Sequence, residues 1–151
     1  MHRLASRPGS HDPAEQGLLI EQPPAAVLLL SSADSDLLAL AALQRSRPQL
    51  LQAEMRCLNL AALGSPAVID HYIASTAAAA RLVVIRLLGG RGHWSYGLEQ
   101  FQNWVQQRRG RQLVVLAGTA DEDASLSELS SVDSDWACAL ARCWREGGAR
   151  A

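Results

Sequence analysis

Three short apolar runs, at residues 26–31, 82–88 and 112–117, constrain the fold of this chain more than any other feature. Each contains at most one charged residue and is far too short to cross a bilayer as a helix. Runs of this kind are typical of strands that are buried on both faces of a parallel sheet. We therefore predict three central strands at these positions.

Segments with helical spacing of apolar residues alternate with these runs. The clearest begins at Pro66, since proline suits the first turn of a helix, and carries Ile69 and Tyr72 on its inner face. Other helices are predicted from about residue 37, from about 95 and over about 133–146, with a further strand near an edge within 51–60. This alternation indicates right-handed βαβ units. We predict an α/β fold, a small Rossmann-like or flavodoxin-like doubly wound sheet, mostly parallel, with about four central strands.

The length of 151 residues favours a single domain. Hydrophobic residues make up 48% and charged residues 19%, which is ordinary for a chain that folds. We expect residues 1–25 to form an N-terminal extension with possible short strands at 2–5 and 17–20. Residues 26–148 form the predicted Rossmann-like domain, and residues 149–151 a tail.

Composition disfavours several classes of function. A net charge of -1 gives no reason to expect a nucleic-acid partner. All fourteen basic residues are arginine, which excludes Schiff-base lysines and the phosphate-loop lysine. The odd number of cysteines, three, favours a reducing compartment. Because no apolar run is long enough for a signal peptide or a membrane span, we expect a cytoplasmic protein without a membrane partner.

Open α/β sheets bind ligands where the carboxyl ends of the strands meet, at the point where strand order reverses. This rule selects the loops at residues 31–36, 88–97 and 117–123. The first contains Ser32, Asp34 and Asp36, which are candidate ligand-binding residues. The same residue types also cap helices, and we favour capping for them. Two aspartates alone are a weak magnesium signal.

The second loop contains the other candidates, Gly89, Gly90, His93, Trp94 and Tyr96. Glycines allow close backbone approach and ring faces suit a flat ligand such as a tetrapyrrole. The glycine spacing does not match a dinucleotide-binding loop. We favour the other interpretation, in which Trp94 and Tyr96 pack against the sheet and His93 is an ordinary exposed residue of the loop. The acidic third loop is interpreted as solvated surface, and no residue is assigned as catalytic or as a metal ligand.

Short segments in collinear order carry a family resemblance. They are residues 30–37, 59–60, 66–72, 81–84, 88–90, 94–97 and 144–148. In this order they resemble the start of the large subunit of aerobic cobaltochelatases, the CobN family, which is similar to the porphyrin-binding subunit of magnesium chelatase. Two features depart from the family pattern, namely the turn at residues 118–121 and His93, where another aromatic residue is usual.

The resemblance implies a part in ATP-dependent insertion of cobalt into hydrogenobyrinic acid a,c-diamide during aerobic cobalamin biosynthesis, a ligase reaction that forms metal–nitrogen bonds. The partners implied are the remainder of the large subunit and AAA-type chelatase subunits, and the complex would use ATP, Mg²⁺ and Co²⁺. This segment would then be a scaffold or part of the corrinoid groove, inactive alone and binding no cofactor itself. Because the chain stops soon after Gly148, a stand-alone docking or regulatory module and a truncated remnant remain alternatives.

Overall fold

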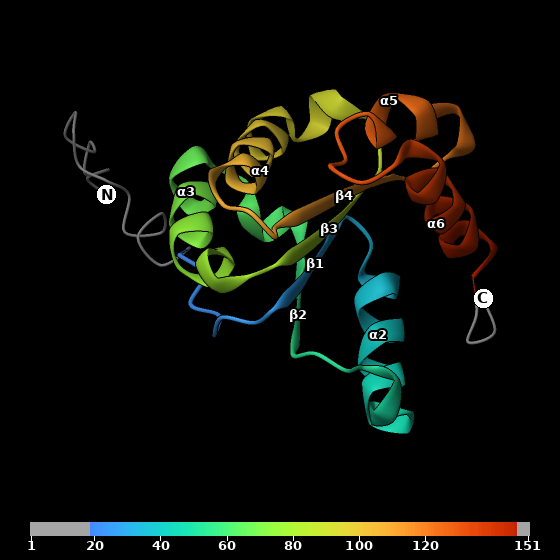
Figure 1. The fold of residues 1–151 in the computed structure, drawn as a ribbon, viewed down its shortest axis with the longest axis horizontal. Helices are drawn as coiled ribbons and strands as arrows, with labels where there is room; N and C mark the ends of the chain where they lie inside the picture. Colours follow the sequence, from blue (N-terminus) through green and yellow to red (C-terminus); the bar gives the residue numbers. More distant parts are fainter. Residues whose placement is uncertain (1–18, 148–151) are drawn as a thin grey trace, which may run out of the picture.

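The computed structural model describes residues 19–147, without the side chains of Glu122 and Asp123. Its centre is a four-stranded sheet in the order β2-β1-β3-β4 (Figure 1). The strands are β1 (Val27–Ser31), β2 (Met55–Asn59), β3 (Leu82–Leu87) and β4 (Gln112–Ala117). All neighbouring pairs are parallel. The predicted α/β class and the parallel sheet of about four strands are therefore confirmed, with β2 at an edge as expected. The strand order is that of the flavodoxin-like type.

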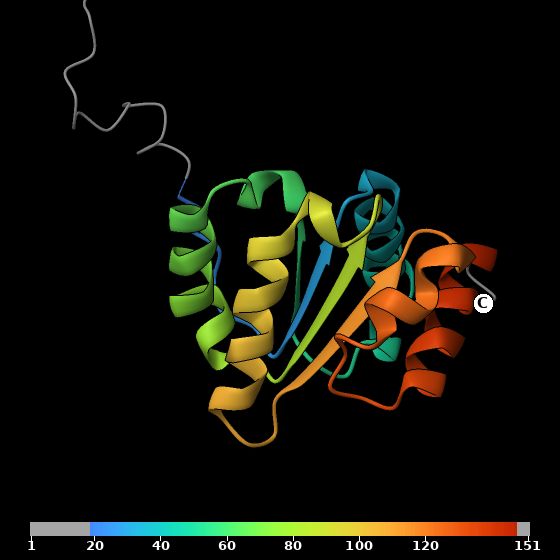
Figure 2. The ribbon, with the colours of Figure 1, turned by 90° about the horizontal axis from the view of Figure 1, so that it is seen from above.

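Helices cover both faces of the sheet (Figure 2). Helices α3 (Pro66–Ala74) and α4 (Ser95–Gln107) lie side by side on one face, whereas α2 (Asp34–Ser46) and α6 (Ser134–Glu146) lie on the other. The short helix α5 (Asp123–Ser127) packs beside β4. Five short 3-10 segments complete the connections, η1 (Pro48–Leu50), η2 (Leu60–Leu63), η3 (Thr76–Ala79), η4 (Arg91–His93) and η5 (Ala120–Glu122).

Local chemistry explains the helix ends. Pro66 occupies the first turn of α3, where its missing N–H costs nothing. Pro48 follows α2 closely, and a residue before proline disfavours the helical conformation. The Asp133 carboxylate accepts a hydrogen bond from the Asp135 backbone N–H at 2.8 Å and so caps α6. Within residues 19–147 no helix combines the length and apolarity that a bilayer crossing requires.

The larger core lies between the sheet and the α3/α4 layer. Its strand residues are Leu28, Leu30, Val83, Ile85, Leu87, Leu113, Val115 and Ala117. The rings of Trp94, Phe101 and Trp104 follow one another through this layer, with centroids 5.9 and 6.1 Å apart. Each buried indole N–H donates to a backbone carbonyl, at 2.9 and 2.8 Å, so neither polar atom is left unpaired.

The core on the α2/α6 face is thinner. Its fully buried members are Val114 and Leu116 of β4 and Ala141 of α6. The one buried residue of α2 is Asp36, while Leu38 of the same helix is 70% exposed. Apolar burial therefore holds this face less strongly, and polar contacts take a larger share in fixing its helices.

Serine side chains cover the open edge of β4. The backbone N–H groups of Leu113 and Val115 donate to the hydroxyls of Ser131 and Ser130, both at 2.8 Å. The Ser131 N–H donates in turn to the Leu113 carbonyl at 2.8 Å. An edge strand has unpaired backbone groups that invite association, and these serines satisfy them. The Ser-rich stretch before α6 is thus a structural edge cover.

The described part of the N-terminal extension, residues 19–25, packs on the domain. The Gln22 side chain accepts a hydrogen bond from the Tyr72 hydroxyl at 2.8 Å and donates to the Cys57 carbonyl at 3.1 Å. Leu19 and Ile20 are not in a strand. The rest of the expected hairpin, residues 2–5 and 17–18, lies outside the described residues.

Candidate functional site

The loops after β1 and β3 leave neighbouring strands at the same edge of the sheet. Strand order reverses between these strands, so this is the position where doubly wound folds bind ligands. Ser32 of the first loop makes two hydrogen bonds here, from its N–H to the carbonyl of Arg86 near the end of β3 at 3.0 Å, and to its hydroxyl from the N–H of Leu88 in the second loop at 3.2 Å. The predicted loops therefore do come together.

The Asp36 carboxylate is the centre of a polar network at this edge. Its Oδ2 accepts hydrogen bonds from the Ser31 hydroxyl at 2.5 Å and from Arg86 Nη1 at 2.8 Å. Its Oδ1 accepts from the Trp144 indole N–H at 2.9 Å. The side chains of Asp36 and Arg86 are only 9% and 12% exposed. One carboxylate thus links β1, β3 and α6 to the first turn of α2.

The network keeps this carboxyl charged. Burial alone would raise the pKa of Asp36, but the hydrogen bonds from Ser31, Trp144 and Arg86, with the Arg86 charge, outweigh burial and lower that pKa. The Arg86 Nε is buried and has no hydrogen-bond partner within residues 19–147. Removing the carboxylate would consequently leave a buried cation without compensation.

The helix-capping interpretation of this loop is wrong. The N-cap of α2 is Ala33, and no side chain caps the helix. Asp34 instead accepts a hydrogen bond from the Asn59 side chain at 2.7 Å, and the hydroxyl of Ser32 serves the neighbouring loop. Tertiary partners compete successfully with the local cap because Asn59 of β2 and Leu88, directly after β3, present their donors at the same edge.

Gly89 and Gly90 both have positive φ, 92° and 81°, which other residues rarely adopt. A Cβ added to Gly89 would lie 2.6 Å from the His93 ring, so the exposed imidazole rests directly on this glycine. The two glycines therefore permit the turn and hold the His93 side chain at the rim.

Trp94 lies beneath this rim. It is 9% exposed, and its indole N–H donates to the Leu63 carbonyl at 2.9 Å. A Cβ at Gly97 would come within 2.2 Å of the indole, so Gly97 leaves the space that the ring occupies. Tyr96 is half-buried and its hydroxyl donates to Asp70 at 2.8 Å, which raises its pKa.

The eight candidate residues therefore divide into two groups. Exposed or half-buried at the rim are Ser32, Asp34, Gly89, Gly90, His93 and Tyr96, whereas Asp36 and Trp94 are buried. A ligand that lies on this edge would meet the first group, and ligand binding by them stays a prediction. Within the described residues, no three or more His, Cys, Asp or Glu side chains are grouped as a metal site would need.

Two curated proteins match nearly the whole chain. One from Pseudomonas aeruginosa is 32% identical over 148 residues, which are 98% of this chain and 12% of that protein. The other, from Sinorhizobium sp, has the same identity over 98% of this chain and 11% of its own length. Both are called aerobic cobaltochelatase subunit CobN. The resemblance to CobN is confirmed.

The chain thus corresponds to a small part of the CobN proteins that it matches. No protein-family model matches it. No solved structure matches it at a significant level.

Sequence reasoning missed three residues of the network, Ser31, Arg86 and Trp144. Arg86 carried a signal, because it is the one charge inside the apolar run of β3, and a buried charge needs a partner. Trp144 belongs to the segment 144–148 that resembles CobN. Nothing local relates it to Asp36, which is 108 residues away in the chain.

Proposed function

We propose that this chain is the N-terminal domain of the large subunit of an ATP-dependent cobaltochelatase, with residues 26–148 as one folded unit. In this proposal the domain is a scaffold and is inactive alone. The complex, which we place in the cytoplasm, inserts cobalt into hydrogenobyrinic acid a,c-diamide in aerobic cobalamin biosynthesis. Its other components are the remainder of the large subunit and AAA-type subunits, with ATP and Mg²⁺.

One observation carries the scaffold role. The position where doubly wound folds bind ligands is filled by the chain's own Asp36, Arg86 and Trp144. These contacts hold α6 to α2 and β3, on a face where apolar burial is thin. A network of this kind fixes the direction of α6, and α6 leads toward residue 148 and whatever follows it in a longer chain.

A chimera tests this proposal. The segment of the Pseudomonas relative that aligns with this chain is deleted or is replaced by residues 1–151, and ATP-dependent cobalt insertion by the assembled complex is followed by corrinoid absorbance. We expect the deletion to abolish cobalt insertion and the chimera to restore it. A chimera with Arg45→Ala, an exposed residue near the end of α2 and outside the candidate loops, serves as a surface control. A deletion that keeps full activity would contradict a scaffold role.

The exposed rim supports a second contribution, to the corrinoid groove. Asp34 and His93 stand at the same edge and present a carboxylate and a ring. In that case, His93→Ala should weaken binding of hydrogenobyrinic acid a,c-diamide to the isolated chain, as measured by the shift in corrinoid absorbance. If the wild-type chain produces no shift, the rim does not belong to the groove.

A further inference from the structure

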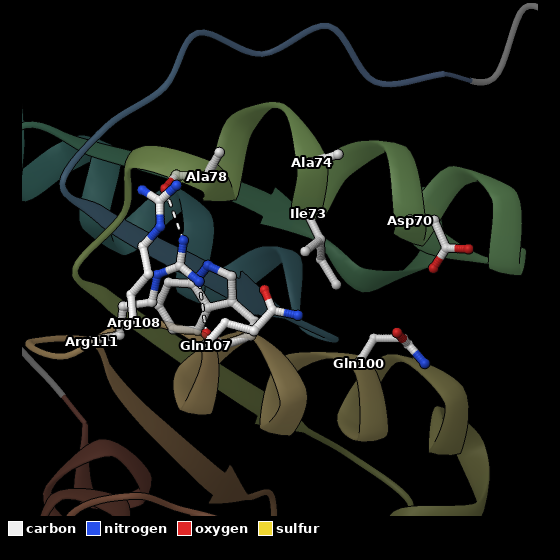
Figure 3. Close-up of a pocket in the computed structure, with 9 residues that line it drawn as sticks. Asp70, Ile73, Ala74, Ala78, Gln100, Gln107, Arg108 and Arg111 are labelled. Carbon is white, nitrogen blue, oxygen red and sulfur yellow. Dashed lines mark hydrogen bonds between the residues drawn. The ribbon is translucent and has the colours of Figure 1, made fainter.

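A groove runs along the outer surface between α3 and α4 (Figure 3). It is open to solvent and has a volume of about 330 Å³. Asp70 and Ile73 of α3 line one wall, Gln100 and Gln107 line the other, and Arg108 lies at the far end from Asp70. The groove lies on the α3/α4 face of the sheet, whereas Asp36 belongs to α2 on the opposite face, so the two features are separate (Figure 1 and Figure 2).

The arginine end of the groove is strongly basic. A second hollow of about 160 Å³ adjoins it there and is lined by Arg81, Arg108, Arg109 and Arg111. The first three are exposed. Within residues 19–147 none of the four forms an ion pair with a carboxylate. Positive charge is thus concentrated here, in a chain whose net charge is -1.

Arg111 holds this end in place. Its guanidinium donates to the carbonyls of Trp104 and Ala78, at 2.7 and 3.0 Å, and lies 4.6 Å from the centre of the Trp104 ring. Burial and the charge of Arg108 lower the pKa of Arg111. The neighbouring cations are therefore close together and are not neutralised by the protein.

The rest of the groove has a different character. Its middle combines apolar Ile73 and Ala74 with the amide side chains of Gln100 and Gln107. Its other end carries the exposed Asp70 carboxylate, which accepts a hydrogen bond from Tyr96. The groove is cationic at one end, neutral along its length and anionic at the other end.

We propose that this groove binds a peptide segment of a partner protein, with acidic side chains at the arginine end. Arginine forks match carboxylates in geometry, and amide side chains can pair with peptide backbone groups. A nucleic acid fits poorly, because Asp70 would repel a backbone that is charged along its whole length. Such binding is weakened by salt, because its charges are exposed.

The test uses the full chain and a short fluorescein-labelled peptide that has a block of glutamates at one end and alanine, leucine and serine elsewhere. Binding is measured by fluorescence anisotropy. We expect the double substitution Arg108→Glu and Arg109→Glu to weaken binding at least about tenfold. The matched control, Arg45→Glu with Arg47→Glu, changes the net charge equally beside the end of α2 and should change affinity less than about twofold.

Three results would overturn the proposal. The first is an equal loss in both double variants, since that would indicate only a general charge effect. The second is equal binding of a peptide with glutamines in place of glutamates. The third is full displacement of the peptide by inorganic phosphate at the same concentration, which would indicate an anion site without peptide recognition. Circular dichroism confirms that each variant is folded, and all four substituted arginines are exposed.

Discussion

Replacing Asp36 by alanine should destabilise the domain more than any other change at the carboxyl edge of the sheet. The substitution leaves the Arg86 guanidinium buried without its counter-charge, and it removes the acceptor for the hydroxyl of Ser31 and the indole N–H of Trp144. Removing one partner of a buried ion pair costs about 3–5 kcal/mol. Because both side chains keep slight exposure, 9% and 12%, we expect about 3 kcal/mol.

Thermal unfolding followed by circular dichroism measures this loss. For a chain of this size each kcal/mol lowers Tm by about 2–4 °C, so Tm should fall by about 6–12 °C. The matched control is Asp34→Ala, an exposed carboxylate two residues away with one hydrogen bond, which should change stability by less than about 1 kcal/mol. A further variant that combines Asp36→Leu with Arg86→Met removes both charges and should be more stable than Asp36→Ala. If Asp36→Ala costs no more than the control, the reasoning about this network is wrong.

The remaining predictions concern pH, packing, the sheet edge and thiol reactivity. Because folding lowers the pKa of Asp36, the ionised carboxylate contributes its full share to stability above the ordinary carboxyl pKa of about 3.9, and this share is lost as pH falls through the folded-state pKa. The Tm difference between wild type and Asp36→Ala should therefore be constant from about pH 5 to 7 and should shrink below about pH 4. Gly97→Ala places a methyl group against the Trp94 indole and should lower the free energy of unfolding, measured in urea, by about 1–3 kcal/mol. Gly92→Ala, whose added methyl group would have no atom within 4 Å, should not lower it in this way. Ser130→Ala with Ser131→Ala leaves two N–H groups of β4 unpaired and should raise aggregation in light scattering, and unchanged solubility would contradict the edge-cover role. Cys143 is exposed, whereas burial raises the pKa of Cys57, so a thiol reagent at neutral pH should modify Cys143 first, as peptide mapping can show.

Much of the fold could be predicted because its signals are local. The strand at 112–117 coincides with β4, and α4 and α6 begin at or next to the predicted residues. A buried strand needs a continuous apolar run and a helix needs spacing of three and four, and both patterns are complete within one segment. The role of Ser130 and Ser131 could not be predicted, because a serine hydroxyl gives no local sign of the strand that it will cover.

The candidate site was harder to predict. The two loops were placed at one edge correctly, since parallel strands put their carboxyl ends together. The roles within the loops were not predictable in the same way. Whether Trp94 is exposed to a ligand or buried depends on the small size of Gly97 and on the Leu63 carbonyl. Leu63 lies 31 residues away in the chain, so only the tertiary structure brings its carbonyl to the indole N–H.

Sequence alone determined the α/β class, the alternation of strands and helices that indicates a parallel sheet, and the kinship with CobN, because each depends on patterns that run along the chain. Tertiary structure alone decided that Asp36 is a buried structural carboxylate and that arginines from two connections form the basic end of one groove. The physical reason is that charge pairing and burial depend on distance in space. Trp144 and Asp36 meet only after the sheet has brought α6 beside α2.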